Sequence, residues 1–196
     1  MKTFRLFAAA AAALALLLAA AVPAAAGDAP EVAAIDIPDV PVLDQEGRKL
    51  LFRTGLVEGK VVAINFIFTN CTTICPPLAA TFGKLRKLLG ERAGRDVHLI
   101  SISVDPVTDT PAHLKAWAAK FGDGPGWTLV TGTREDITRL LKSLGAYTAN
   151  MNDHPPLVLI SNRRGQWTRA YGLASPAKLV TAIDEMAASG EQGASR

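Results

Sequence analysis

An apolar run at residues 61–68 leads directly into the only two cysteines of the chain, Cys71 and Cys75. The run is rich in β-branched and aromatic residues, which is typical of a strand that is buried on both faces. Pro76 and Pro77 follow, and they suit the first turn of a helix, where a missing N–H costs nothing. The pattern therefore predicts a buried strand, a turn that carries both sulfur atoms, and a helix. We call residues 69–75 the cysteine turn.

Strand and helix patterns alternate through the rest of the chain. Strands are predicted at 98–104, 128–130, 157–161 and 166–171, and helices at 111–121, 135–144 and 175–188, the last with Ser175 as its N-cap. A hairpin at 42–50, turning at Glu46-Gly47, precedes them. We expect an α/β fold, a thioredoxin-like sandwich with a central mixed sheet flanked by helices and an N-terminal β-hairpin extension. A Rossmann domain fits less well, because no glycine-rich phosphate turn follows the first core strand.

The N-terminus resembles an export signal. Lys2 and Arg5 precede an apolar stretch at 6–22, and Ala24-Ala25-Ala26 suits cleavage by signal peptidase. Residues 1–26 are therefore predicted to be a signal peptide that directs the chain to a periplasm. The stretch is near the lower limit of the ~17–25 residues that span a bilayer, so an uncleaved inner-membrane anchor is the alternative.

The remaining chain is the right length for one domain. We expect an N-terminal arm at 27–41, a thioredoxin-like domain at 42–188 and a frayed tail at 189–196. The chain has 21 basic and 18 acidic residues, and two of the basic ones lie in the signal, so the exported protein is close to neutral. This balance argues against nucleic-acid binding, which uses a clustered basic face.

Two cysteines are too few to staple a small domain, so the pair is predicted to be a functional site. At i and i+4, Cys71 and Cys75 can lie one helical turn apart on one face. A helix N-terminus favours the thiolate, which metal binding and disulfide exchange both need. The alternative is an inert structural disulfide or two buried thiols.

The chain has three histidines that could supply a third ligand. His98 lies within a strand pattern and His113 in the first turn of a helix, where structural or solvated roles are expected. His154 lies in the loop before the penultimate strand, and in a thioredoxin-like sandwich this loop faces the cysteine turn. Two thiolates and one imidazole form a soft set that selects Cu(I) and can also hold Cu(II). Zinc would need a fourth ligand or a water molecule.

Two residues near His154, Met151 and Asp153, could also take part in the site. Met151 could offer a thioether, but methionine commonly fills gaps in packing, and we expect that role. Asp153 could orient the imidazole as a hydrogen-bond acceptor, although a plain loop carboxylate is equally compatible.

Three separated segments carry a family resemblance: Phe68-Thr69-Asn70-Cys71 with Ile74-Cys75-Pro76, Ser103-Val104-Asp105-Pro106 with Asp109-Thr110-Pro111, and Asp153-His154. Over about residues 36–186 the chain resembles the Sco/SenC family of thioredoxin-like copper proteins. The resemblance implies a metallochaperone that binds copper through Cys71, Cys75 and His154. It would help to assemble the binuclear copper site of cytochrome c oxidase by delivering copper or reducing that site's cysteines. Its partners would be the copper-site subunit or another periplasmic copper protein, and thiol reductants.

Two other functions remain open on the residues alone. The first is a thiol-disulfide oxidoreductase for which copper is incidental and in which Cys71 and Cys75 form a redox-active pair. The second is a peroxidase of peroxiredoxin type, in which one cysteine attacks peroxide. Only the shared scaffold supports the second.

Overall fold

The computed structural model describes residues 33–191. The predicted signal peptide, the start of the predicted arm and the last five residues lie outside this range. The described chain forms one mixed sheet with the strand order β1-β8-β7-β4-β5-β6-β2-β3. The strands are β1 (Ala33–Ala34), β2 (Pro41–Asp44), β3 (Lys49–Leu51), β4 (Val61–Ile67), β5 (Val97–Ser103), β6 (Trp127–Thr131), β7 (Leu157–Ser161) and β8 (Gln166–Tyr171).

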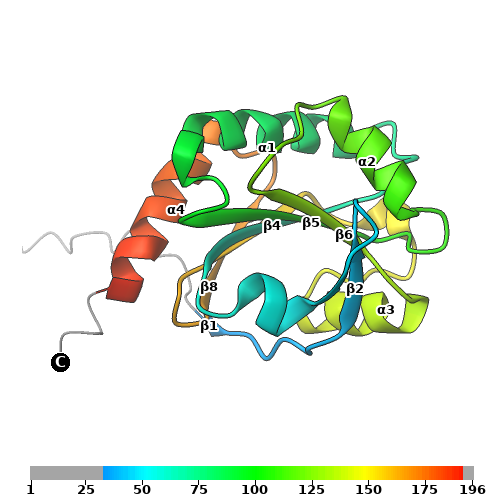
Figure 1. Cartoon of the computed structure of the whole chain (residues 1–196), viewed down its shortest axis with the longest axis horizontal. Coiled ribbons are helices and arrows are strands. Elements are labelled where there is room, and N and C mark those ends of the chain that lie inside the picture. The colour runs from blue at the N-terminus through cyan, green and yellow to red at the C-terminus, as the bar shows by residue number, and fades with distance from the viewer. Residues whose placement is uncertain (1–32, 192–196) are drawn as a thin grey trace, which may run out of the picture.

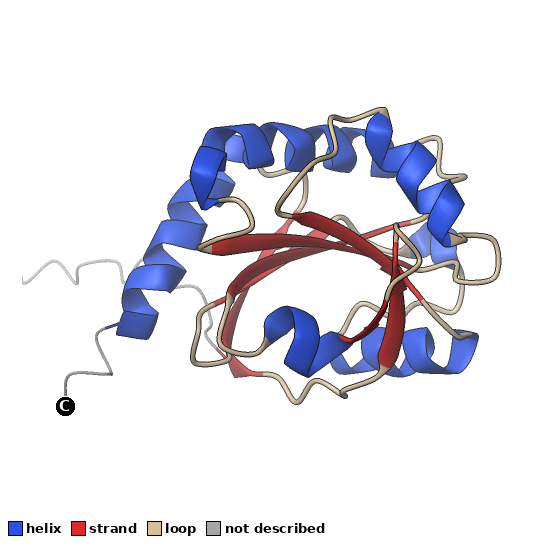
Figure 2. Ribbon diagram, in the orientation of Figure 1, coloured by secondary structure: helices blue, strands red, loops and turns tan. Residues whose placement is uncertain are grey.

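Four α-helices flank the sheet (Figure 2). They are α1 (Cys75–Leu89), α2 (Pro111–Ala119), α3 (Arg134–Ser143) and α4 (Pro176–Glu191). Ser175 caps α4 as predicted, because its hydroxyl accepts the Lys178 N–H at 3.3 Å. The helix runs three residues past its predicted end at Ala188, where Asn162 Nδ2 donates to Ser189 Oγ at 3.1 Å and holds the last turn.

Four short elements were not predicted, one of them a 3₁₀ turn, Gly90–Arg92, that follows α1. β1 pairs antiparallel with β8 at one edge of the sheet, although two alanines carry no strand pattern. One π-helical turn, Phe52–Val57, follows the β2–β3 hairpin and buries Phe52 completely. A 3₁₀ turn, Met151–Asp153, lies just before His154. Tertiary contacts stabilise these short elements, so local sequence patterns do not reveal them.

The strand order brings the cysteine turn and the loop that carries His154 to the same end of the central strands. β4 runs parallel to β5 and antiparallel to β7, with Asn65 opposite Val158. The carboxyl ends of β4 and β5 therefore meet the amino end of β7. The cysteine turn leaves this edge from β4, and the loop that carries His154 enters β7 at the same edge.

Helices cover both faces of the sheet. α1, α2 and α4 lie on one face, and α3 and the π-helical turn lie on the other (Figure 1). All seven residues of β4 are buried. They alternate between two cores: Val61 and Ala63 pack beneath α1, whereas Val62 and Ile64 pack towards α3. This confirms the prediction of a strand buried on both faces. Within residues 33–191, no helix is both long enough and apolar enough to cross a membrane.

The N-terminal hairpin is attached to the sheet partly by a side chain. β2 pairs with β6 for only two residues. Beyond that pair, the Gln45 amide donates from Nε2 to the Trp127 carbonyl at 3.2 Å and accepts the Leu129 N–H at 2.9 Å. One side chain thus satisfies a donor and an acceptor that a longer strand would have paired.

We expect Gln45→Ala to lower the free energy of unfolding by about 1–2 kcal/mol, because it leaves these two partly buried backbone groups without partners. Urea denaturation measures the change. The matched control is Glu46→Ala, which removes only an exposed ion pair with Lys115 and should cost about 0.5 kcal/mol or less. Equal losses in the two variants would show that the Gln45 bonds do not anchor the hairpin.

Candidate metal centre

The two cysteines lie at the start of α1, but not on one helical turn. Cys75 is the first residue of α1, whereas Cys71 lies in the non-helical segment before it, so the predicted i, i+4 helical pairing is wrong. Pro76 and Pro77 have no N–H, so the Cys75 N–H is the only backbone donor among the first three residues of α1. It donates to Cys71 Sγ at 3.3 Å. The sulfur of Cys71 therefore caps the positive end of α1.

The two thiols have different acidities. Burial opposes ionisation of Cys71, but hydrogen bonds from Cys75 and Thr73 outweigh it, and the pKa of Cys71 lies below its ordinary value. The Thr73 hydroxyl lies 3.7 Å from Cys71 Sγ. Burial, and then the neighbouring Cys71 sulfur, raises the pKa of Cys75 to about 12. Cys71 is 8 % exposed and Cys75 is fully buried. Cys71 is therefore both the more acidic and the less buried of the two thiols.

His154 meets this pair from the other side. Its side chain is buried, and its Nε2 lies 3.7 Å from Cys75 Sγ. Its Nδ1 lies 3.4 Å from the Pro155 carbonyl, which can only accept, so Nδ1 carries the proton and Nε2 presents a lone pair to the sulfur. Burial lowers the pKa of His154, against a weaker opposing effect of the Pro155 carbonyl, and this favours the neutral form of the ring. The Phe68 ring stands edge-on to it, with centroids 6.0 Å apart.

The three predicted ligands form a chain of contacts. Cys71 Sγ contacts the Cys75 amide, and Cys75 Sγ contacts the imidazole. Both cysteines are free thiols. Within residues 33–191, no three or more His, Cys, Asp or Glu side chains are placed closely enough to hold a metal ion as they stand. Two sulfurs and a neutral imidazole nitrogen are nonetheless the donors that Cu(I) prefers, and these ligands would have to close around the ion as it binds.

The other two histidines lie elsewhere, as predicted. His98 is half-buried in β5, where burial lowers its pKa. His113 is exposed at the start of α2, and its Nδ1–H donates to the Thr108 carbonyl at 2.7 Å. Neither ring is hydrogen-bonded to Cys71, Cys75 or His154.

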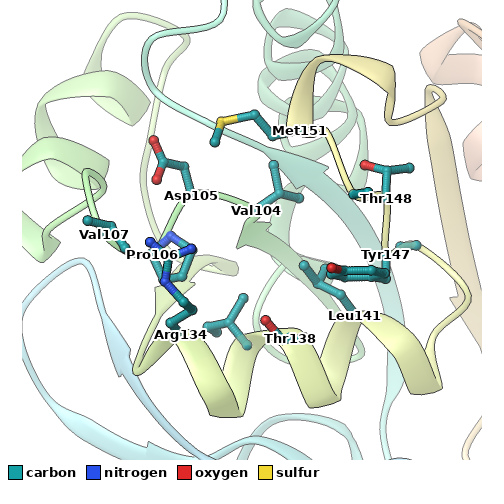
Figure 3. Close-up of a pocket in the computed structure, with 13 residues that line it drawn as sticks. Val104, Asp105, Pro106, Val107, Arg134, Thr138, Leu141, Tyr147, Thr148 and Met151 are labelled. Atoms are coloured by element: carbon teal, nitrogen blue, oxygen red, sulfur yellow. The ribbon is translucent and has the colours of Figure 1, made fainter.

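The neighbours of His154 have the roles of packing and solvent contact. Met151 packs against the core beneath α1 and borders a cavity of about 150 Å³ that Asp105, Arg134 and Tyr147 also line (Figure 3). The predicted packing role of Met151 is confirmed. Asp153 is exposed, and the imidazole Nδ1 contacts the Pro155 carbonyl instead. The hypothesis that Asp153 orients the ring is therefore wrong.

Sequence reasoning assigned no role to Asp109, which the structure places close to the cysteine turn. Its side chain is 1 % exposed and accepts hydrogen bonds from Thr69 and Ser103. One signal was available in the sequence. Thr110 is the natural N-cap of the helix that begins at Pro111, and it does accept the His113 N–H, so the carboxylate before it is not needed for capping.

Known proteins resemble this chain in sequence and in fold. A sequence model described as SCO1/SenC matches residues 41–188, which is most of the chain. The chain belongs to the SCO1/SenC family. The SCO1 protein homolog of Bacillus subtilis (strain 168) is 40 % identical to it over 90 residues, 45 % of each protein. The match thus spans about half the length of that relative.

Two solved Sco structures extend the comparison over more of the chain. BsSco, described as a cytochrome c oxidase assembly protein with a disulfide switch, has a TM-score of 0.67 and 26 % identity, covering 82 % of this chain and 98 % of that one. ScoI of Bradyrhizobium japonicum, solved with copper bound, has a TM-score of 0.64 and 25 % identity, covering 77 % and 99 %. These matches confirm the predicted thioredoxin-like fold and the family resemblance.

Proposed function

We propose that this SCO1/SenC protein is a periplasmic metallochaperone that binds one copper ion through Cys71, Cys75 and His154. It then serves the assembly of the binuclear copper site of cytochrome c oxidase or of another periplasmic copper protein. One observation carries the proposal: Cys75 Sγ and the neutral His154 Nε2 lie 3.7 Å apart although 79 residues separate them in the chain. The copper bound to ScoI and the assembly role given to BsSco support it.

The unequal thiols suit the uptake of a soft cation. Cys71 is the more exposed and the more acidic sulfur, so it is the one that meets an incoming ion. Cys75 has to lose its proton to become a ligand, so binding releases a proton. His154 is already neutral and can offer Nε2 without deprotonation. Because all three side chains are largely buried, an ion held by them would have little contact with solvent.

Reduced protein should bind about one Cu(I), and His154→Ala should weaken that binding by at least about tenfold, or ~1.4 kcal/mol, because one of three donors is lost. Competition with a chromophoric Cu(I) chelator measures the affinity. His113→Ala is the matched control, since His113 is exposed on α2 and its ring is hydrogen-bonded to the Thr108 carbonyl and to neither thiol. If His154→Ala binds Cu(I) as tightly as His113→Ala, the ligand assignment is wrong.

The unequal pKa values also favour a second function, thiol-disulfide exchange. The Cys71 thiolate would attack a client disulfide, forming a mixed disulfide and releasing one client thiolate. Cys75, giving up its proton, would then attack Cys71 Sγ, release the second client thiol and leave a Cys71–Cys75 disulfide for a thiol reductant to reduce.

Variants of His154 and of the two cysteines distinguish copper delivery from thiol-disulfide exchange. If exchange alone is the cellular role, His154→Ala should support oxidase assembly while loss of either cysteine abolishes it. If copper delivery is the role, all three variants should fail. Oxidase activity of cells that carry each variant gives the answer.

A further inference from the structure

Asp109 is a buried carboxylate that joins the ends of two central strands. Thr69, just after β4, donates its N–H at 3.2 Å and its hydroxyl at 2.5 Å, and Ser103, the last residue of β5, donates its hydroxyl at 2.6 Å. Asp109 takes part in none of the ion pairs found within residues 33–191. Burying a carboxylate without a cation is costly, and these hydrogen bonds offset that cost.

The residue that Asp109 holds lies between the two halves of the site. Thr69 follows Phe68, whose ring stands edge-on to His154 and whose carbonyl accepts the Cys71 N–H at 3.2 Å. A shift of Thr69 would therefore move the base of the cysteine turn and the ring that packs on the imidazole together. Nothing else among the described side chains bonds to the Thr69 N–H or hydroxyl.

We propose that Asp109 is a positioning residue: by holding Thr69, it keeps the cysteine turn at the distance from His154 at which both thiols and the imidazole can reach one ion. An apolar side chain of the same size would leave the Thr69 N–H and the hydroxyls of Thr69 and Ser103 without an acceptor, so it could not hold Thr69 in this position. The inference deepens the proposed function and rests on it where copper is the readout.

Asn is the sharpest replacement, because it keeps the size of Asp109 and removes one acceptor. Each carboxylate oxygen now receives a hydroxyl, one from Thr69 and the other from Ser103. In Asp109→Asn the amide NH₂ must face one of these hydroxyls. If the NH₂ faces Thr69, it meets two other donors, the Thr69 hydroxyl and the Thr69 N–H. If the NH₂ faces Ser103, the Ser103 hydroxyl proton loses its acceptor, and the Ser103 oxygen already accepts the Asp105 N–H at 3.1 Å.

The first measurement is Cu(I) affinity of the reduced full chain. Asp109→Asn should bind Cu(I) about tenfold more weakly than the wild type, in line with the loss that follows when groups supporting metal ligands are removed. Thr69→Val is the second variant. It keeps the backbone donor and removes only the hydroxyl, so a smaller loss is expected. The double variant should lose less than the sum, since both changes break the same contact.

The second measurement needs no copper. Equilibration of Cys71 and Cys75 with glutathione reports how well the turn holds the two thiols together. Asp109→Asn should disfavour the intramolecular disulfide about tenfold, which corresponds to about 30 mV. If Asp109 only stabilised the fold, Asp109→Asn would lower the melting temperature and leave the thiol–disulfide equilibrium unchanged. A wild type that binds no Cu(I) overturns the proposed function, whereas the glutathione equilibrium still decides the role of Asp109.

Asp105→Asn is the matched control. Asp105 lies in the same loop and lines the cavity of Figure 3, but its carboxylate accepts a hydrogen bond only from the Thr108 N–H, at 3.4 Å. It should leave affinity and equilibrium within about twofold of wild type. The proposal is overturned if Asp109→Asn and Thr69→Val also stay within that range, or if Asp105→Asn matches their losses.

Discussion

Cys71 is expected to react with iodoacetamide about a thousandfold faster than Cys75 at pH 7–8. Only the thiolate reacts, and each unit of pKa changes its fraction tenfold. The pKa of Cys75 is raised to about 12, chiefly by burial, whereas the pKa of Cys71 lies below the ordinary 9.0 because its hydrogen bonds outweigh burial. Because Cys75 is fully buried, iodoacetamide also reaches its sulfur less easily, which slows its reaction further. Peptide mapping after brief alkylation of the reduced protein measures the ratio.

The pH dependence separates acidity from access. The rate at Cys71 should rise with pH and level off at a lower pH than that of an ordinary cysteine, because its thiolate forms as pH passes through a lowered pKa. The rate at Cys75 should still be rising at pH 10, because its pKa is about 12. In denaturant the two thiols should react alike. Preferential labelling of Cys75 in the folded protein would contradict the assigned asymmetry and reverse the order of steps in the proposed exchange.

Gly83→Ala should destabilise the fold by about 3 kcal/mol, at the upper end for overpacked cores. Gly83 is buried in α1, and a Cβ there would lie 2.0 Å from the Phe121 carbonyl oxygen. A backbone carbonyl cannot rotate away as a flexible side chain can, so either α1 or the turn that follows α2 and contains Phe121 has to move. This cost outweighs the ~1 kcal/mol by which alanine favours a helix over glycine.

Thermal and urea unfolding measure the effect of Gly83→Ala, and a loss of this size corresponds to about 6–12 °C in Tm. Gly55→Ala is the control, because a Cβ at Gly55 meets only the Leu50 Cβ at 4.0 Å, an ordinary contact. It should be neutral or slightly stabilising. If Gly83→Ala is as stable as Gly55→Ala, α1 is not seated against Phe121 as described. Since α1 begins at Cys75, its seating also matters for the site.

Local features of the sequence were sufficient to predict most of the fold. The β7–β8 hairpin occupies the predicted residues, and α4 begins as Ser175-Pro176 indicates. Periodicity, caps and turn residues act over a few positions, so they can be read without a structure. The start of α1 was predicted less well. The cysteine spacing suggested a helical turn, whereas the two prolines leave the Cys75 N–H to be capped by Cys71.

The sequence by itself determined the donor types of the candidate site, two thiols and one imidazole, and the family to which the chain belongs. Only the tertiary structure decided how they meet. Antiparallel pairing of β7 with β4 brings His154 to Cys75, and packing buries one thiol more deeply than the other. The grip of Asp109 on Thr69, across 40 residues, arises in the same way. Distances and acidities of this kind depend on long-range pairing and desolvation, which no local pattern encodes.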